Sequence, residues 1–142
     1  QLRNFFATTT TTTTDVVVGY ISVHTRAYCM KIHSLAVAPP ARSLGVGSRL
    51  LDYALDVALR SRAITVVALH VSTSNATAAR MYSRRGFSAV RWLSGYYRDE
   101  TTYTEDDALF MVATTDTIEQ RRYAQQLLRK QQQQQQQQQW QP

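Results

Sequence analysis

The hydrophobic positions of this chain first follow a strand period and then a helical one. The segment Val16–His24 is rich in β-branched and aromatic residues, and Tyr28–Val37 repeats this character after a short polar turn. The two segments predict a pair of antiparallel strands. From Val46 onward the hydrophobic residues recur on one helical face as far as Ala58, which predicts an amphipathic helix. A buried strand is then expected over Ala63–Val71.

A second helix and two further strands complete the pattern. The segment SNATAARMYSRRGF predicts a short helix that is capped by Asn75 and ended by Gly86. The segments FSAVRWL and Ala108–Ala113 predict strands. The order strand-strand-helix-strand-helix-strand-strand indicates an α/β (α+β) fold. We expect a mixed, mostly antiparallel sheet, flanked by helices, with a crossover helix after the second strand.

Two low-complexity runs lie near the ends of the chain. The threonine run, residues 8–14, lies between Phe5-Phe6 and the first strand described above, so we interpret it as a hairpin loop. The glutamine run, residues 131–139, follows a predicted helix and is expected to be disordered or fraying helix. We therefore predict one domain over residues 1–113 and a basic helical and poly-Gln tail over residues 114–142.

Charge and composition narrow the classes of partner and location. The net charge is +6, of which the tail from Thr114 carries +2, so the basic surface favours an anionic ligand and indicates no specific nucleic acid. Cys29 is the only cysteine, which excludes disulfides and cysteine-based zinc sites, and we expect no metal. No apolar run is long enough to cross a bilayer. We expect a cytoplasmic protein, with the cytosolic face of an organelle membrane as the alternative.

The tail also has a membrane alternative. Its basic helix contains Ile118, Leu127 and Leu128, which could lie on a membrane surface. A helical tail in solvent is the interpretation we favour.

The segment PPARSLGVGSRLL carries the first chemical signal. Glycines at Gly45 and Gly47 leave a helix N-terminus bare, where unpaired N–H groups and the helix dipole attract anions, and Arg42 adds a forked donor. The segment lacks the Gly-Lys-Ser/Thr of a P-loop and the third glycine of a Rossmann fingerprint. The spacing R-x-x-G-x-G between a strand and a helix resembles the acetyl-CoA loop of the GNAT acetyltransferases.

A second region carries the same resemblance further. The residue spacing in this region resembles that after the fifth strand and along the following helix of GNAT proteins. The residues that carry it are Asn75, Ala78, Tyr82, Gly86 and Phe87. The segments LHVSTSN, YSRRGF and GYY resemble the protein N-terminal acetyltransferases of the NatE and NatF catalytic-subunit type. The resemblance covers roughly residues 16–112 and implies a GNAT fold.

The resemblance implies roles for individual residues. His70 would serve as a base, usually through ordered water, and Tyr96 and Tyr97, after the sixth strand, would line the peptide channel. Tyr82 would protonate the leaving thiolate, and together with Asn75 it belongs to the implied donor site. The remaining residues of that site are Leu35, Val37, Arg42, Ser43, Leu44, Gly45, Val46, Gly47 and Ser48. Backbone near Leu35 and Val37 would pair with the pantetheine arm where the sheet splays, and an N–H near Val37 would polarise the thioester carbonyl.

The chain departs from the NatE and NatF pattern in two respects. Lys31 occupies the place of a tyrosine base, so we expect it to face solvent or to contact substrate. His33 shares its strand face, where it is a possible second base or lines the channel. GNAT domains open with a strand and two helices, whereas only QLRNFF precedes the threonine run. We therefore expect a fragment or a half-open site.

These observations predict an acetyl-CoA-dependent enzyme that acetylates the α-amine of protein N-termini, mostly ones that begin with methionine. An α-amine has a pKa of about 8 and a lysine side chain one of about 10.4, so a histidine base suits the α-amine better. The alternatives are a GNAT enzyme for lysine side chains or small amines, and a catalytically impaired acetyl-CoA-binding module. The expected partners are a peptide N-terminus and a ribosome or auxiliary acetyltransferase subunit.

Overall fold

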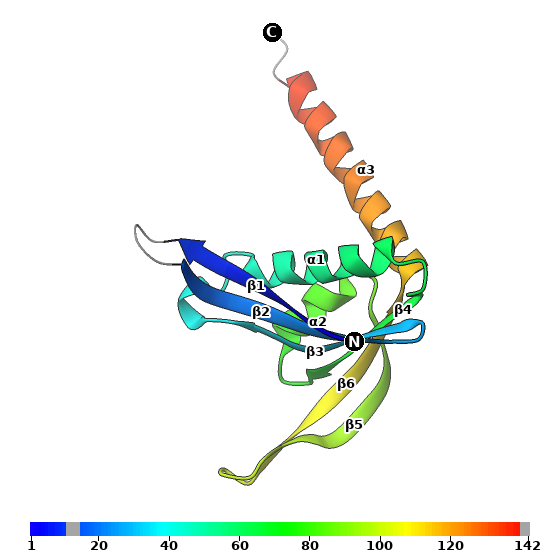
Figure 1. The fold of residues 1–142 in the computed structure, drawn as a ribbon. Helices are drawn as coiled ribbons and strands as arrows, with labels where there is room; N and C mark the ends of the chain where they lie inside the picture. The colour runs from blue at the N-terminus through cyan, green and yellow to red at the C-terminus, as the bar shows by residue number, and fades with distance from the viewer. Residues whose placement is uncertain (11–14, 140–142) are drawn as a thin grey trace.

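Six strands form a single sheet in the order β1-β2-β3-β4-β6-β5 (Figure 1). The computed structural model describes residues 1–10 and 15–139. The strands are β1 (Leu2–Thr10), β2 (Asp15–Arg26), β3 (Cys29–Val37), β4 (Val66–Ser72), β5 (Ser88–Asp99) and β6 (Thr104–Thr114). Only the β3–β4 pair is parallel among the pairs of the described residues. The predicted mixed sheet is confirmed.

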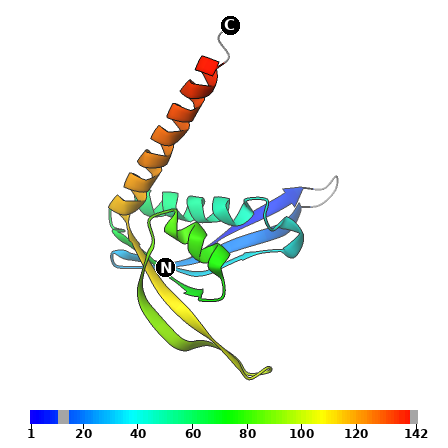
Figure 2. The same ribbon diagram turned by 180° about the vertical axis from the view of Figure 1, so that it is seen from behind.

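Three helices lie on the same side of this sheet: the first two pack over its face, and the third extends away from it with its base beside the first (Figures 1 and 2). They are α1 (Val46–Arg60), α2 (Ala76–Ser83) and α3 (Thr115–Gln139), and a 3-10 turn, Pro39–Ala41, precedes α1. Because α1 joins the parallel strands β3 and β4, it is the predicted crossover helix. None of the helices in the described part of the chain is long and apolar enough to cross a membrane.

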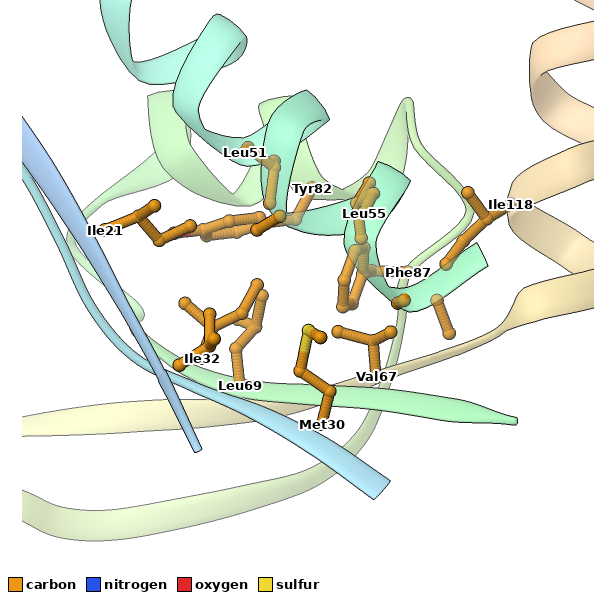
Figure 3. Packing of buried hydrophobic residues seen from close by; sticks show 14 of the residues in the cluster. Ile21, Met30, Ile32, Leu51, Leu55, Val67, Leu69, Tyr82, Phe87 and Ile118 are labelled. Atoms are coloured by element: carbon orange, nitrogen blue, oxygen red, sulfur yellow. The ribbon is translucent and has the colours of Figure 1, made fainter. Parts of the chain in front are cut away.

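The hydrophobic core lies between the helices and the covered face (Figure 3). Ile21 and Leu69 from the strands, Leu51 and Leu55 from α1, and Ile118 from α3 are each at most 1% exposed. Burying side chains of this size stabilises the fold by about 1.5–3 kcal/mol each. The core therefore includes the first turns of α3, beyond the predicted boundary at residue 113.

Helix α3 is anchored at its start and along its first half. Thr114 and Thr117 cap it reciprocally: the Thr117 N–H donates to Thr114 Oγ1 at 3.1 Å, and the Thr114 N–H donates to Thr117 Oγ1 at 2.9 Å. Further along, Arg122 Nη1 lies 2.5 Å from Asp56 Oδ1 on α1. The helix then continues through the glutamine run to Gln139, so the described part of that run is helical.

The hairpin-loop prediction for the threonine run is wrong for its first three residues. Thr8, Thr9 and Thr10 belong to β1 and pair with Val17, Val16 and Asp15 of β2. Threonine is β-branched and fits a pleated strand, which explains why the strand continues into the run. Residues 11–14 lie outside the described residues.

Two other predicted strand boundaries are also wrong. The third predicted strand begins at Val66 rather than Ala63, because Ser61–Ile64 forms a turn in which the Ile64 N–H donates to Ser61 O at 3.2 Å. The strand that begins with FSAVRWL does not end there but continues to Asp99. Tyr96 and Tyr97 therefore lie within β5 rather than after it.

Candidate active site

The sheet opens between its two parallel strands. Their pairing runs from Cys29 opposite Val66 to Ile32 opposite Leu69, and no later pair joins these strands in the described residues. On the other side of β3 the register shifts between Ser22 and Val23, which leaves His33 as the extra residue of a bulge. The predicted splay near Leu35 and Val37 is thus confirmed, and the strands part at Ile32 and Leu69.

The loop that follows β3 presents the start of α1 to this opening. Gly45 is the N-cap residue, with a left-handed φ of +80°. No side chain caps α1, and its first turn contains no acidic residue. A Cβ at Gly45 would meet nothing within 4 Å, so the helix N-terminus is open to a ligand. Bare N–H groups and the helix dipole make this end of α1 suitable for an anion.

Arg42 is held beside this helix terminus. Its Nε donates to the Val37 carbonyl at 3.0 Å, which ties the loop to the end of β3. Ser43 has a left-handed φ of +63°, an uncommon conformation for a residue with a side chain, and Leu44 is 72% exposed. The predicted donor residues Arg42–Ser48 therefore span the turn before α1 and the first residues of that helix, and Arg42 and Gly47 lie next to Val37.

His70 lies on the uncovered face of the sheet, one residue beyond the last β3–β4 pair. The ring of Tyr96 stacks on its imidazole, with centroids 4.5 Å apart and planes inclined by 15°. Phe110 contacts the imidazole as well, at 4.9 Å, and Tyr97 lies edge-on to Tyr96 at 5.0 Å. The structure thus brings together three residues that the sequence predicted for the acceptor side: His70, Tyr96 and Tyr97.

A bulge in β5 sets the position of the two tyrosines. The register between β5 and β6 shifts between Leu93 and Tyr97, and Gly95 in this bulge has a φ of +59°. The Asp107 carboxylate accepts hydrogen bonds from the Gly95 N–H at 2.8 Å and from Trp92 Nε1 at 2.9 Å. These hydrogen bonds hold the pKa of Asp107 below its ordinary value. Sequence reasoning missed Asp107, although the glycine within WLSGYY was a signal of a bulge.

Tyr82 packs in the hydrophobic core, on the helix side of the sheet. It is 6% exposed and lies edge-on to Phe87 at 5.8 Å. Burial raises the pKa of its hydroxyl, and the neighbouring Tyr97 raises it further, so the hydroxyl keeps its proton at neutral pH. Asn75 caps α2, since its Oδ1 accepts a hydrogen bond from the Ala78 N–H at 3.1 Å.

Electrostatics keep the His70 imidazole neutral near pH 7. Burial lowers its pKa below the ordinary value of 6.5, and the positive charge of Lys31 lowers it further. Lys31 pairs with Ala68 across the parallel ladder, so it lies on the same face as His70. A neutral imidazole can accept a proton, which is the chemistry expected of a base.

The second histidine of β3 lies elsewhere on the open face. His33 is exposed, and its ring is 5.9 Å from that of His24 on β2, whereas the aromatic neighbours of His70 are Tyr96 and Phe110. Its predicted role as a second base stays a prediction.

The loop between β4 and α2 is anchored on β6. The hydroxyls of Ser72 and Ser74 both donate to Asp106 Oδ2, the latter at 2.9 Å, and Thr73 donates to Asp106 Oδ1 at 3.3 Å. These hydrogen bonds lower the pKa of Asp106 and tie the loop after His70 to β6.

Comparison with known sequences decides the family. The sequence model of the acetyltransferase (GNAT) family matches residues 3–87, more than half of the chain. This chain belongs to the GNAT acetyltransferase family. The GNAT fold predicted from the loop and from the Asn75–Phe87 spacing is confirmed.

Individual relatives fall into more than one class of acetyltransferase. N-alpha-acetyltransferase 50 from Danio rerio is 32% identical over 91 residues, which cover 59% of this chain and 52% of the relative. Mycothiol acetyltransferase from Beutenbergia cavernae is 43% identical over 60 residues, or 42% of this chain and 20% of the relative. The chain spans about half, or less, of the length of these curated relatives.

A solved structure of a plant relative is similar as well. Arabidopsis thaliana Naa50, in complex with the bisubstrate analogue CoA-Ac-MVNAL, has a TM-score of 0.60 and 27% identity. The match covers 68% of this chain and 65% of the plant chain.

Proposed function

We propose that this chain transfers the acetyl group of acetyl-CoA to the α-amine of protein N-termini. The observation that carries the proposal is the stack of Tyr96 on His70, one residue beyond the point where β3 and β4 part. A neutral base and a tyrosine pair lie beside this opening, and the loop after β3 leads to the bare N-terminus of α1.

The donor would be held by the turn before α1. The N–H groups at the start of α1 would bind the pyrophosphate, with the free guanidinium nitrogens of Arg42 beside them. The backbone of β3 from Leu35 to Val37 is unpaired on the β4 side among the described residues and is available to an extended ligand. When bound, acetyl-CoA supplies a thioester that is already activated for acyl transfer.

The acceptor amine must lose its proton, and His70 is the residue suited to take it. An α-amine with a pKa of about 8 is partly neutral near pH 7, whereas a lysine side chain with a pKa of about 10.4 is almost fully charged. To deprotonate a lysine near pH 7, the site would have to lower the pKa of the lysine amine by about three units. This would cost about 4 kcal/mol, which is a large demand on a site whose base is a half-exposed imidazole. His70 therefore favours an α-amine, and the protonated Tyr82 hydroxyl would return a proton to the leaving thiolate.

The comparisons support this choice without deciding it. The Danio rerio relative is named for N-alpha acetylation, and the analogue bound to the Arabidopsis thaliana relative begins with methionine. We therefore extend the proposal to N-termini that begin with methionine and to a cytoplasmic location, where a ribosome or an auxiliary subunit would be the partner. Small amines are the second candidate, because mycothiol acetyltransferase is also a relative.

The test is an acetylation assay with peptides that differ only in their first two residues, and with a peptide whose α-amine is blocked but which contains lysine. We expect acetylation of free N-termini and none of the blocked peptide. The His70→Gln variant should lose activity and the matched His24→Gln variant should keep it. Acetylation confined to lysine or to small amines would refute the N-terminal acceptor.

A separate measurement tests the donor site. The Arg42→Ala, Gly47→Trp double variant should lose acetyl-CoA binding, as measured by calorimetry, and Arg62→Ala should not, since Arg62 lies in the turn after α1. Unchanged binding in the double variant would refute the assignment of the loop.

A further inference from the structure

A cavity of about 300 Å³ lies beside the candidate active site and shares only Ser48 with it, between α1, the C-terminal end of α2 and α3. Its lining is dominated by arginines from α3 and from the end of α2. They are Arg84, Arg85, Arg121, Arg122 and Arg129. Figures 1 and 2 show the base of α3 beside α1, where these elements meet.

Two of these arginines are neutralised by carboxylates of α1. Arg85 forms a bidentate pair with Asp52, at 2.6 Å from Nε to Oδ1 and 3.0 Å from Nη2 to Oδ2. Arg122 pairs with Asp56 at 2.5 Å and also donates to the Asp52 carbonyl at 3.2 Å. Asp52 and Asp56 are therefore already paired with arginines.

The other three arginines carry charge that nothing in the described residues 1–10 and 15–139 neutralises. The guanidinium groups of Arg84, Arg121 and Arg129 have no ion pair and no hydrogen bond to a cavity partner there. On α3, Arg121, Gln125 and Arg129 follow one another at intervals of four residues, so these three side chains share one face of the helix. Like charges that face a common space repel one another, and an anion in that space would relieve the repulsion.

The walls of this cavity are fixed by tertiary contacts. Gln125 Nε2 donates to the Arg84 carbonyl at 3.1 Å, which joins α3 to the end of α2. Ile118 anchors the same helix in the core at 1% exposure (Figure 3). The three unpaired arginines therefore stand on elements whose relative position is set, which lowers the cost of binding an anion.

We propose that this arginine-lined cavity binds a phosphate group. The planar guanidinium group of arginine can donate two parallel hydrogen bonds to phosphate oxygens. Several guanidinium groups around one space favour a doubly charged phosphate over a singly charged carboxylate as the ligand. The phosphate has two possible sources. One is the 3′-phosphate of CoA, because Ser48 belongs both to the end of the donor loop and to the cavity lining; this source rests on the proposed function. The other is a separate phosphorylated molecule.

The first experiment uses inorganic pyrophosphate alone, titrated calorimetrically at constant ionic strength. Arg121→Gln with Arg129→Gln should weaken binding by at least about tenfold, because two charge-assisted contacts are lost. The matched control, Arg62→Gln with Lys130→Gln, removes the same charge outside the cavity and should bind as the native chain does. Circular dichroism checks that every variant is folded.

Three results of this titration would overturn the proposal. The native chain could show no saturable binding, or the control could weaken binding as much as the cavity variant does. Binding could also be lost in Arg42→Gln but kept in the cavity variant, which would place the ion at the N-terminus of α1. None of these readouts depends on acetyl transfer, so they are separate from the failure of the proposed function.

A second experiment distinguishes the two sources. If the 3′-phosphate of CoA occupies the cavity, the cavity variant should bind CoA as weakly as the native chain binds dephospho-CoA. Its affinity for dephospho-CoA should be unchanged. If the ligand is a separate molecule, the cavity variant should bind CoA normally, and pyrophosphate should still bind to the CoA-saturated chain.

Discussion

The two faces of the sheet differ in what their side chains do. On the face under the helices, Ile21, Val23 and Leu69 are at most 1% exposed and belong to one hydrophobic cluster. On the other face, His70 and Lys31 are only half-buried, and the helices of the described residues lie on the opposite side of the sheet (Figures 1 and 2). A closed face can supply stability, and an open face can admit a substrate.

The difference shows how the strands can serve both purposes at once. Successive residues of a strand point to opposite faces, so Leu69 packs against the helices while its neighbour His70 faces the opening. Changes on one face should therefore affect stability and changes on the other should affect catalysis, and four predictions test this separation.

The largest effect is expected from Leu55→Ala on the covered face. Leu55 is fully buried, so its truncation removes apolar contacts and leaves a cavity, which should lower the free energy of unfolding by about 2–5 kcal/mol. The control is Phe6→Ala on the open face, where Phe6 is 61% exposed and the loss should stay below about 1 kcal/mol. Chemical denaturation measures both, and equal losses would contradict the separation of the faces.

The next largest effect is expected from His70→Gln. Loss of the base should reduce kcat by about 100-fold or more, with little change in the free energy of unfolding. His24→Gln changes a histidine on the same open face, away from the Tyr96 stack, and should leave kcat unchanged. A His70 variant with full kcat would remove this residue from the mechanism.

A smaller effect is expected from the bulge that positions the tyrosines. Asp107→Ala removes the acceptor for the Gly95 and Trp92 N–H groups, so Tyr96 should shift from His70 and kcat/KM should fall by roughly tenfold.

Three further variants make this prediction specific. Gly95→Ala should act in the same direction, because its φ is +59° and its Cβ would lie 2.9 Å from Glu105 Oε2. Glu100→Ala at the hairpin tip is the control, and Asp107→Asn should retain part of the activity. The NMR spectrum of the His70 ring reports the shift, because loss of the stacked Tyr96 ring changes its chemical shift. An unchanged spectrum in Asp107→Ala would exclude a positioning role.

The smallest effect is expected from Lys31→Met. Desolvation and the Lys31 charge both disfavour the imidazolium form of His70, so removing the charge should raise its pKa toward the ordinary value. Activity that requires neutral His70 should then begin to fall at a higher pH when the solution is acidified. An NMR titration of His70 measures the change, with Lys130→Met as the control. A pKa that stays the same or falls would show that Lys31 does not act on His70.

Local patterns were sufficient for most elements and for the conformation of the proposed donor loop. The helical period from Val46 and the positions of Gly45 and Gly47 predicted both α1 and its bare N-terminus, because these features depend on neighbouring residues alone. The threonine run shows the limit of such patterns. Residues 8–10 read as a polar loop, but pairing with β2 makes them a strand.

The arrangement around His70 was predictable only through family resemblance. His70 and Tyr96 are 26 residues apart in the sequence, and no local pattern indicates that their rings stack. The contact arises because β6 lies between β4 and β5, while the Asp107-bound bulge turns Tyr96 toward the histidine.

By itself the sequence determined most of the elements, the family resemblance and the glycine loop before α1, since short-range periodicity and spacing encode them. Tertiary structure alone decided which side chains meet. Pairing across the sheet joined His70 to Tyr96, and packing of α3 on α1 gathered the unpaired arginines around one cavity. Both arrangements depend on long-range packing and electrostatics, which no local stretch of sequence specifies.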